Sequence, residues 1–359
     1  MSFRPFIFFF LVVFALGTFA RAQDIDSYRQ CSACTDEQLK TFFNETATPY
    51  AGFSLLQPQG LVNEGDRRSI ILFHGLSDSP YYLKDLAALF YRSGFDVFVP
   101  LIKAHGDDYA GFERIKQTEW TKQTETIFQQ VSARYENVSL GGFSNGGLLA
   151  TRLSVNPDYK DKIRSLYLFS PALRLPFLSL WVGRFAGLVE SLKKVLRFEN
   201  VDRLVQRFLS LKVVKDNCVG CAGAVRYADI PLNAVRQVQA GGEQLRRVLK
   251  NVKVQIPTFM VLSSADTVIN SNYIKKLFVE KFSGAKHLFW IDSTGGVVNT
   301  SGIPTDQITV IKSEIPVLHS SVTLKESQLA KPTEVNGNFS QLQSTLVRHM
   351  VLSCRSLFP

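Results

Sequence analysis

The chain has 359 residues, of which 45% are hydrophobic, 20% charged and 12% aromatic. This length and composition allow one large α/β domain or a core with an inserted unit, and they exclude a disordered or collagen-like chain. The formal net charge of +10 is compatible with binding to nucleic acid, with an anionic membrane or with solubility alone, and five histidines are too few for a His-rich metal cluster.

The first 22 residues have the pattern of a secretory signal peptide. Arg4 precedes an apolar run over residues 5–16, and the segment ends in the small-x-small cleavage site Ala20-Arg21-Ala22. An uncleaved anchor is the alternative, but a membrane-spanning helix needs about 20 apolar residues and this run is shorter. We predict cleavage after Ala22 and a secreted or periplasmic protein, in which the loss of two arginines lowers the net charge from +10 to +8.

The five cysteines form two C-x-x-C pairs, Cys31/Cys34 and Cys218/Cys221, with Cys354 left over. The distance between the pairs is far longer than the spacing of zinc ribbons, and an oxidising compartment favours disulfides over a zinc site. Four cysteines allow three pairings, and the sequence does not choose among them. A thioredoxin-like redox role is the weaker alternative, because neither pair opens a recognisable βαβ unit.

After the signal peptide, short apolar runs alternate with helical patterns. Strands are predicted at 69–73, 95–99, 138–140, 166–169 and 258–262, and helices at 82–91, 120–131, 148–153 and 272–282. A further apolar run at 288–291 and a final helical pattern at 342–352 follow. This alternation predicts an α/β fold with a mainly parallel sheet covered by helices on both faces.

The alternation stops between residues 172 and 253. This segment carries 15 Lys or Arg and six Asp or Glu, a surplus of nine, so the positive net charge of the mature chain is concentrated in it. Apolar residues from Trp181 to Leu196 recur at helical spacing with basic residues between them. We expect a helical cap with a solvated basic face, and transient contact with an anionic membrane is the sharper alternative. Nucleic-acid binding is not expected, because the basic residues lack interleaved aromatics and no reader motif is present.

Residues 142–146 read Gly-Phe-Ser-Asn-Gly and lie between a predicted strand and a predicted helix. In this context G-x-S-x-G places the serine on a sharp turn, where small neighbours leave its hydroxyl clear of the sheet. The pentapeptide alone is common by chance, so the prediction depends on its context. Ser144 is the candidate nucleophile.

A serine hydroxyl becomes nucleophilic when a base accepts its proton and a third group holds the base. Asp266 lies in the loop after a predicted strand, at the sheet edge where α/β proteins bind ligands, although a solvated loop aspartate is the alternative. Of the histidines after the serine, His287 begins an apolar run at the opposite end of a strand, and His349 falls within the final helix. His319, in a loop-like segment, is the candidate base by elimination.

The oxyanion of an acyl-transfer intermediate needs two backbone N–H donors. Asn145 supplies the first, and Leu76, after the earlier strand and His74-Gly75, supplies the second. His74 precedes the serine and is interpreted as a loop-shaping residue. The segment from Asp292 to Glu314, which separates the last apolar run from the candidate base, is interpreted as an inserted loop or hairpin.

These motifs resemble the α/β-hydrolase superfamily, and within it the carboxylesterases and monoacylglycerol lipases. The matching pieces, spread from about residue 53 to the C-terminus, are Phe73-His74-Gly75-Leu76, Val99-Pro100, Ala104-His105-Gly106, residues 142–146, Ser170-Pro171-Ala172 and the Asp266 loop. Ala104 departs from the family's usual Gly, and the segment with Cys31 and Cys34 has no assigned counterpart. The resemblance implies an α/β-hydrolase fold with a core of residues 23–171 and 254–359 and a helical cap of residues 172–253.

The resemblance also implies two-step acyl transfer on a small-molecule or lipid ester. His319 deprotonates Ser144, the two N–H groups hold the oxyanion, and water cleaves the acyl-enzyme, with Asp266 fixing the imidazole and no cofactor required. Apolar residues at the cap entrance, among them Leu173 and Trp181, favour an apolar acyl chain. A secreted peptidase or acyltransferase on the same fold, or a catalytically inactive binding protein, stays open, although the three triad residue types in order argue against the last.

Overall fold

The computed structural model describes residues 24–44, 51–60, 66–106, 108–176, 226–227, 230–293, 295, 298–314, 316–323 and 338–355. The predicted signal peptide, the predicted helix from Trp181 to Leu196 and the pair Cys218/Cys221 lie outside the described residues. Within the described ranges, no helix combines the length and the apolar character that a membrane span requires.

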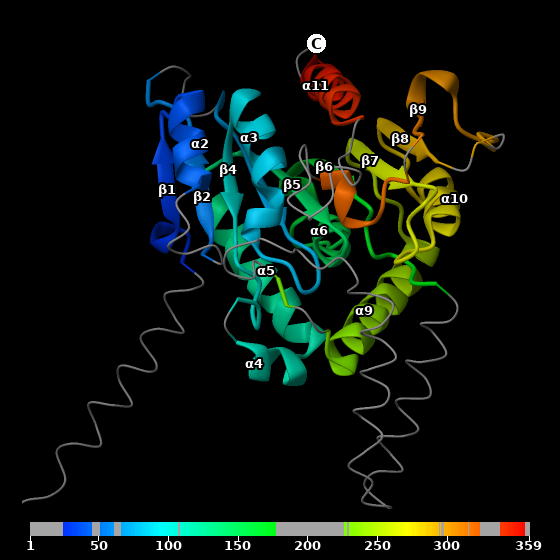
Figure 1. Ribbon diagram of the computed structural model, residues 1–359, viewed down its shortest axis with the longest axis horizontal. Coiled ribbons are helices and arrows are strands. Elements are labelled where there is room, and N and C mark those ends of the chain that lie inside the picture. The colour runs from blue at the N-terminus through cyan, green and yellow to red at the C-terminus, as the bar shows by residue number, and fades with distance from the viewer. Residues whose placement is uncertain are drawn as a thin grey trace, which may run out of the picture.

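A nine-stranded sheet forms the centre of the described structure (Figure 1), in the order β1-β2-β4-β3-β5-β6-β7-β8-β9. The strands are β1 (Arg29–Ser32), β2 (Phe53–Leu56), β3 (Arg68–Phe73), β4 (Phe95–Val99), β5 (Asn137–Phe143), β6 (Ile163–Phe169), β7 (Thr258–Ser263), β8 (Lys286–Asp292) and β9 (Ile308–Lys312). Neighbouring strands are parallel except β2 and β4. The mainly parallel sheet predicted from the sequence is therefore confirmed.

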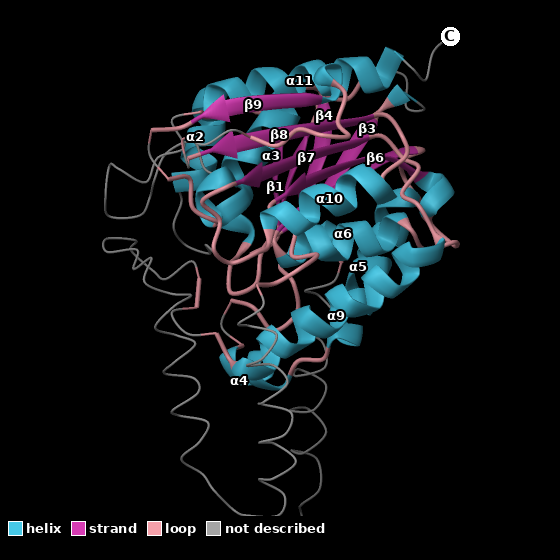
Figure 2. Ribbon diagram, turned by 90° about the vertical axis from the view of Figure 1, so that its right-hand side faces the viewer, coloured by secondary structure: helices cyan, strands magenta, loops and turns pink. Residues whose placement is uncertain are grey.

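Helices cover both faces of the sheet, with α5, α6 and α10 on the side opposite to α11 (Figure 2). The helices are α2 (Asp36–Asn44), α3 (Lys84–Arg92), α4 (Tyr109–Arg114), α5 (Gln117–Ser132), α6 (Asn145–Ser154), α9 (Leu232–Asn251), α10 (Ser271–Lys281) and α11 (Phe339–Arg355). Successive strand residues point to opposite faces. Ile70 and Leu72 accordingly pack with α2, α3 and α11, while Ile71 and Phe73 pack with α5, α6 and α10.

The N-terminal part adds an edge to the sheet that the sequence did not predict. β1 pairs with β2, and α2 covers them through Phe42, whose ring centroid lies 5.9 Å from that of Phe53. Cys31 in β1 and Cys34 directly after it form a disulfide, one of the three pairings left open. Both β1 and β2 have four residues, too few for a clear periodic pattern.

The interpretation of residues 292–314 as an inserted loop or hairpin is wrong. The segment contains β9, which pairs with β8 in parallel, from Leu288 opposite Ile308 to Asp292 opposite Lys312. A hairpin would have placed the two strands antiparallel. Because β9 is an edge strand whose residues are half-buried or exposed, it lacks the apolar run that marks the central strands.

Helix α9 is the described helical part of the basic segment. Its buried positions Ala234, Val238, Leu245 and Leu249 follow helical spacing and join the core beside α5 and α6. The exposed side chains of the helix include Arg247 and Lys250. The helix therefore has an apolar inner stripe and an exposed basic face, and the cap over residues 172–253 stays a prediction.

Candidate active site

Ser144 occupies a sharp turn between β5 and α6. Its backbone has φ 53° and ψ −116°, a left-handed conformation that costs a non-glycine residue about 1–3 kcal/mol. The chain passes so close to β3 here that a Cβ atom at Gly146 would overlap the Phe73 carbonyl and lie 2.7 Å from the His74 oxygen. A Cβ at Gly147 would lie 2.8 Å from the Pro171 side chain. These contacts explain the small residues after the serine, and they match the strand-turn-helix context predicted for the motif.

Asp266 follows β7 at the carboxyl edge of the sheet, and its side chain is fully buried. Its Oδ1 accepts hydrogen bonds from the backbone N–H groups of Val268, at 2.9 Å, and Ile269, at 3.1 Å. Its Oδ2 lies 2.6 Å from Nδ1 of His319. A buried carboxylate requires such partners, and here the three contacts also fix its orientation.

His319 lies just before the short helical turn Ser320–Thr323, and its ring centroid is 4.8 Å from that of Phe143, the residue before the serine. Because a carboxylate only accepts hydrogen bonds, Nδ1 carries the hydrogen toward Asp266, and Nε2 of the neutral ring presents a lone pair. Nε2 is buried and has no hydrogen-bond partner among the described residues. The structure therefore brings acid and imidazole together beside the serine turn.

Three serines that the sequence pattern did not indicate hold the segment that carries His319. Ser263 Oγ, at the end of β7, donates to the Val317 carbonyl at 2.6 Å. The Val317 N–H donates to Ser293 Oγ at 3.4 Å, and the Ser293 N–H donates to Ser264 Oγ at 2.8 Å. These bonds connect the ends of β7 and β8 to the imidazole segment. Only the Ser-Ser pair shortly before Asp266 gave a signal for them.

The two candidate oxyanion donors lie on adjacent segments. Asn145 is the first residue of α6, where the N–H groups of the first turn have no intrahelical acceptor. Leu76 follows Gly75 after β3, and a Cβ at Gly75 would lie 2.8 Å from the Phe143 ring. The loop after β3 therefore packs directly against Phe143, the residue before the serine, and the oxyanion role of Leu76 and Asn145 stays a prediction.

A family model described as serine aminopeptidase, S33 (Hydrolase_4), matches residues 65–294. The chain belongs to this family of α/β hydrolases. A thermostable monoacylglycerol lipase of Bacillus sp. (strain H-257) is 29% identical over 90 residues, which are 25% of this chain and 36% of the lipase. The chain thus aligns with little more than a third of that relative, and the similarity agrees with the resemblance to monoacylglycerol lipases.

Solved structures of other proteins share the fold. A structure reported for LipS and LipT, two metagenome-derived lipolytic enzymes, has a TM-score of 0.54 at 16% identity and covers 81% of this chain and 96% of its own. Est1E from Butyrivibrio proteoclasticus with bound ferulic acid has a TM-score of 0.50 at 12% identity, covering 85% of this chain and 95% of its own. The predicted α/β-hydrolase fold is confirmed.

His74 has a structural place in this α/β hydrolase. Its Nδ1–H donates to the Gly75 carbonyl at 2.9 Å, and its Nε2 accepts from the Ile102 N–H at 3.0 Å. Burial, with a contribution from nearby His105, holds the pKa of His74 well below its ordinary value. Both nitrogens are used, which agrees with the loop-shaping role. Ala104, where the resemblance expects Gly, has φ 63°, a left-handed conformation that favours glycine.

The other downstream histidines of the α/β hydrolase lie at the opposite end of the strands. His287, near the start of β8, is in register with Phe259 at the start of β7, and its Nε2 lies 2.9 Å from Thr309 Oγ1. His349, in α11, has its ring centroid 5.4 Å from that of Phe259. Asp266 follows the other end of β7, so the structure brings neither ring to it.

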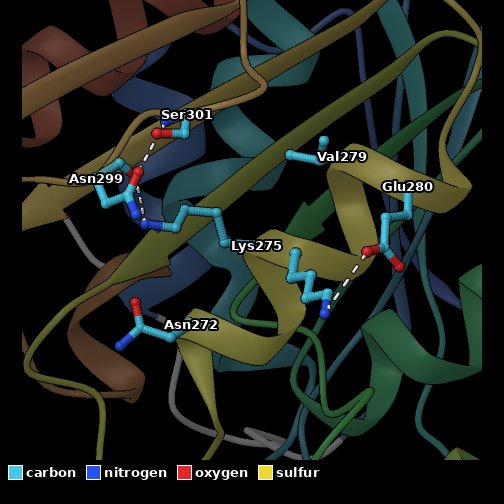
Figure 3. Close-up of a pocket in the computed structure, with 7 residues that line it drawn as sticks. Asn272, Lys275, Val279, Glu280, Asn299 and Ser301 are labelled. Carbon is cyan, nitrogen blue, oxygen red and sulfur yellow. Dashed lines mark hydrogen bonds and ion pairs between the residues drawn. The ribbon is translucent and has the colours of Figure 1, made fainter.

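A cavity of about 460 Å³ lies on the outer side of α10 (Figure 3), and none of the candidate catalytic residues lines it. Lys275 Nζ donates to the Asn299 carbonyl at 2.8 Å, and Lys276 lies 3.8 Å from the Glu280 carboxylate. The residues that line the cavity are Asn272, Lys275, Lys276, Val279, Glu280, Asn299 and Ser301. No group of three or more His, Cys, Asp or Glu side chains in the described part of the chain is placed to hold a metal ion.

Proposed function

We propose that this α/β hydrolase is a secreted serine hydrolase that cleaves carboxylic esters through Ser144, His319 and Asp266. The observation that carries the proposal is the 2.6 Å contact between His319 Nδ1 and a buried Asp266 oxygen, beside a serine in a strained strand-to-helix turn. The chain order Ser, Asp, His is the order typical of this fold. The similarity to a monoacylglycerol lipase supports an ester as the substrate.

In the proposed reaction, Nε2 of His319 accepts the Ser144 proton as Oγ attacks the ester carbonyl carbon. This hydrogen bond forms in the substrate complex, since catalytic contacts are often long in the free enzyme. The N–H groups of Leu76 and Asn145 hold the oxyanion, and each such donor lowers the barrier by about 3 kcal/mol. The imidazolium, stabilised by Asp266, protonates the leaving alcohol, and water activated by His319 then cleaves the acyl-enzyme.

The acyl chain in this proposal is apolar and of medium length. Leu173 is buried just after β6, and the neighbouring Ala172 N–H donates to the Ser144 carbonyl at 2.8 Å, so this apolar segment adjoins the serine turn. On a series of nitrophenyl esters we expect kcat/KM to rise from acetate to a medium-length optimum. A preference for acetate would refute the apolar pocket while leaving esterase activity intact.

A fluorophosphonate probe tests the nucleophile. We expect covalent labelling of the wild type and no labelling of Ser144→Ala. The matched control is Ser154→Ala, because Ser154 ends the same helix and its Oγ donates to the Thr151 carbonyl at 2.7 Å. Labelling of Ser144→Ala at the rate of the wild type would overturn the proposal.

A peptidase is the second candidate, because the matching family model is described as a serine aminopeptidase. The same three residues would attack an amide in place of an ester. Comparison of kcat/KM on aminoacyl nitroanilides and on nitrophenyl esters separates the two. A higher value on the anilides would favour the peptidase.

We further propose that the mature chain begins after Ala22 and that its basic segment makes transient contact with anionic membrane. The surplus of nine positive charges in residues 172–253 and the exposed Arg247 and Lys250 of α9 support this contact. N-terminal sequencing of the exported protein tests the cleavage. Sedimentation with phosphatidylglycerol vesicles tests the contact, which high salt should abolish and phosphatidylcholine vesicles should not reproduce.

A further inference from the structure

The loop that supplies the Leu76 N–H contains a buried charge. We call residues 75–79 the oxyanion loop. Within it, the Asp78 side chain is 2% exposed, and its Oδ1 accepts from Arg226 Nη2 at 2.7 Å and from Nε at 3.1 Å. The guanidinium carbon lies 4.4 Å from the centre of the Tyr82 ring. A carboxylate removed from water in this way depends on its cationic partner.

Tyr227, the residue after Arg226, also contacts the oxyanion loop. The Tyr227 N–H donates to the Ser77 carbonyl at 2.9 Å, and the Tyr227 ring centroid lies 5.0 Å from that of Phe112 in α4. Arg226 and Tyr227 belong to the segment predicted as the cap, 148 positions after Asp78 in the case of Arg226. Two consecutive residues of that segment therefore hold two consecutive residues of the oxyanion loop.

The hydrogen bonds of the loop determine which way the Leu76 N–H points. The Gly75 carbonyl accepts from His74 Nδ1 at 2.9 Å and from the Asp78 N–H at 3.3 Å. The peptide unit that joins Gly75 to Leu76 is planar and trans, so its N–H points opposite to its C=O. Fixing the Gly75 carbonyl therefore fixes the direction of the Leu76 N–H. The backbone N–H of Asp78 holds this carbonyl, and Arg226 holds the side chain of Asp78.

We propose that Arg226 is a positioning residue for catalysis, which through Asp78 keeps the Gly75–Leu76 peptide oriented as an oxyanion donor. The proposal rests on the proposed function and extends it, because it makes the catalytic geometry depend on the segment predicted as the cap. Arg226 acts on an interaction that forms in the transition state and not in the ground state. Its loss should therefore lower kcat more than it raises KM.

The chain offers a closely matched control pair. Arg67 Nη2 lies 2.7 Å from Asp96 Oδ2, with side-chain exposures of 21% and 1%, against 16% and 2% for Arg226 and Asp78. Asp96 lies near the amino end of β4, at the opposite edge from Ser144. Breaking either pair leaves a buried carboxylate without its arginine, so the two losses of stability should be comparable.

The test compares Arg226→Gln, Arg226→Lys and Arg67→Gln in the full-length protein. We expect Arg226→Gln to lower kcat on nitrophenyl esters roughly ten- to a hundredfold. It should weaken a boronate inhibitor, which forms a tetrahedral adduct, by a similar factor, with KM nearly unchanged. Arg226→Lys should recover part of kcat, and Arg67→Gln should lower the melting temperature but keep kcat and boronate affinity.

Equal kcat and boronate affinity in Arg226→Gln and Arg67→Gln, whether both are retained or both lost, overturns the inference. Should Arg226→Gln fail to fold, Arg226→Lys carries the comparison, because Lys keeps the charge with a single point of contact. A wild type that neither hydrolyses esters nor reacts with the fluorophosphonate probe overturns the proposed function itself. An active, labelled wild type with an unaffected Arg226→Gln overturns this inference alone.

Discussion

Histidines lie at both ends of the sheet, and their surroundings differ. At the carboxyl end, His319 meets the buried carboxylate of Asp266 at 2.6 Å and leaves Nε2 without a partner among the described residues. At the amino end, His287 and His349 pack around Phe259, with the His287 and Phe259 rings stacked at 5.8 Å. All three imidazoles are largely or partly withdrawn from water.

The difference lies in the partner and not in the residue type. A carboxylate beside Nδ1 fixes the tautomer and stabilises the imidazolium that forms when Nε2 accepts a proton. Burial lowers the pKa of both His287 and His349, and nearby Asp306 offsets this effect at His287 only in part. The contact with a carboxylate therefore distinguishes His319, whereas burial disfavours the protonated forms of His287 and His349.

The most severe test of this contrast exchanges each type of histidine for alanine. We expect His319→Ala to lower kcat/KM on nitrophenyl esters by on the order of ten-thousandfold, because the serine loses its base. His287→Ala should stay within about twofold of the wild type, since that ring lies at the other end of β8. A large loss in His287→Ala with activity retained in His319→Ala would reverse the assignment.

Removing the carboxylate while keeping the imidazole tests the partner directly. Asp266→Asn should lower kcat roughly a thousandfold or more, because an amide can hold the imidazole in the wrong tautomer and does not stabilise its charged form. Asp292→Asn is the control, because Asp292 is also buried and ends the adjacent strand β8. Equal losses in the two variants would show that burial at this edge, and not the contact with His319, is what matters.

The fold was predictable from the sequence where strands are buried on both faces. Strands β3 to β8 have apolar runs, and α3, α5, α6 and α10 between them have apolar residues at helical spacing, so the alternation predicted both, whereas α4 and α9 were not predicted. β1 and β2 were not predicted because they have only four residues each, and β9 was not predicted because it is an edge strand whose residues are half-buried or exposed. Residues 292–314 show the consequence, since an edge strand was taken for a loop or hairpin.

The candidate site was predictable only in part. Ser144, Asp266 and His319 each follow a strand, and strands in a parallel sheet place their carboxyl ends at one edge, so the sequence predicted that the three residues lie at the same edge. Their catalytic roles stay a prediction. The contact between Asp78 and Arg226 had no local signal, because it joins a loop to a segment 148 positions away.

The smallest effect is expected at the amino end, on stability. Burial, together with the nearby charge of His287, lowers the pKa of His349 from 6.5 to about 4. Between pH 6.5 and pH 4, the unfolded chain therefore binds a proton at His349 that the folded chain does not bind. The stabilisation from a neutral His349 is therefore complete above about pH 6.5 and is lost as the pH falls toward 4, by roughly 3 kcal/mol.

His349→Gln cannot take up a proton, so its free energy of unfolding in urea should fall less than that of the wild type between pH 7 and about pH 4.5. His105, whose pKa is also lowered to about 4, contributes equally to both proteins and cancels in the difference. Ester hydrolysis by His349→Gln at pH 7 should stay within about twofold of the wild type, and an unchanged acid sensitivity would show that the aromatic cluster does not hold this histidine neutral.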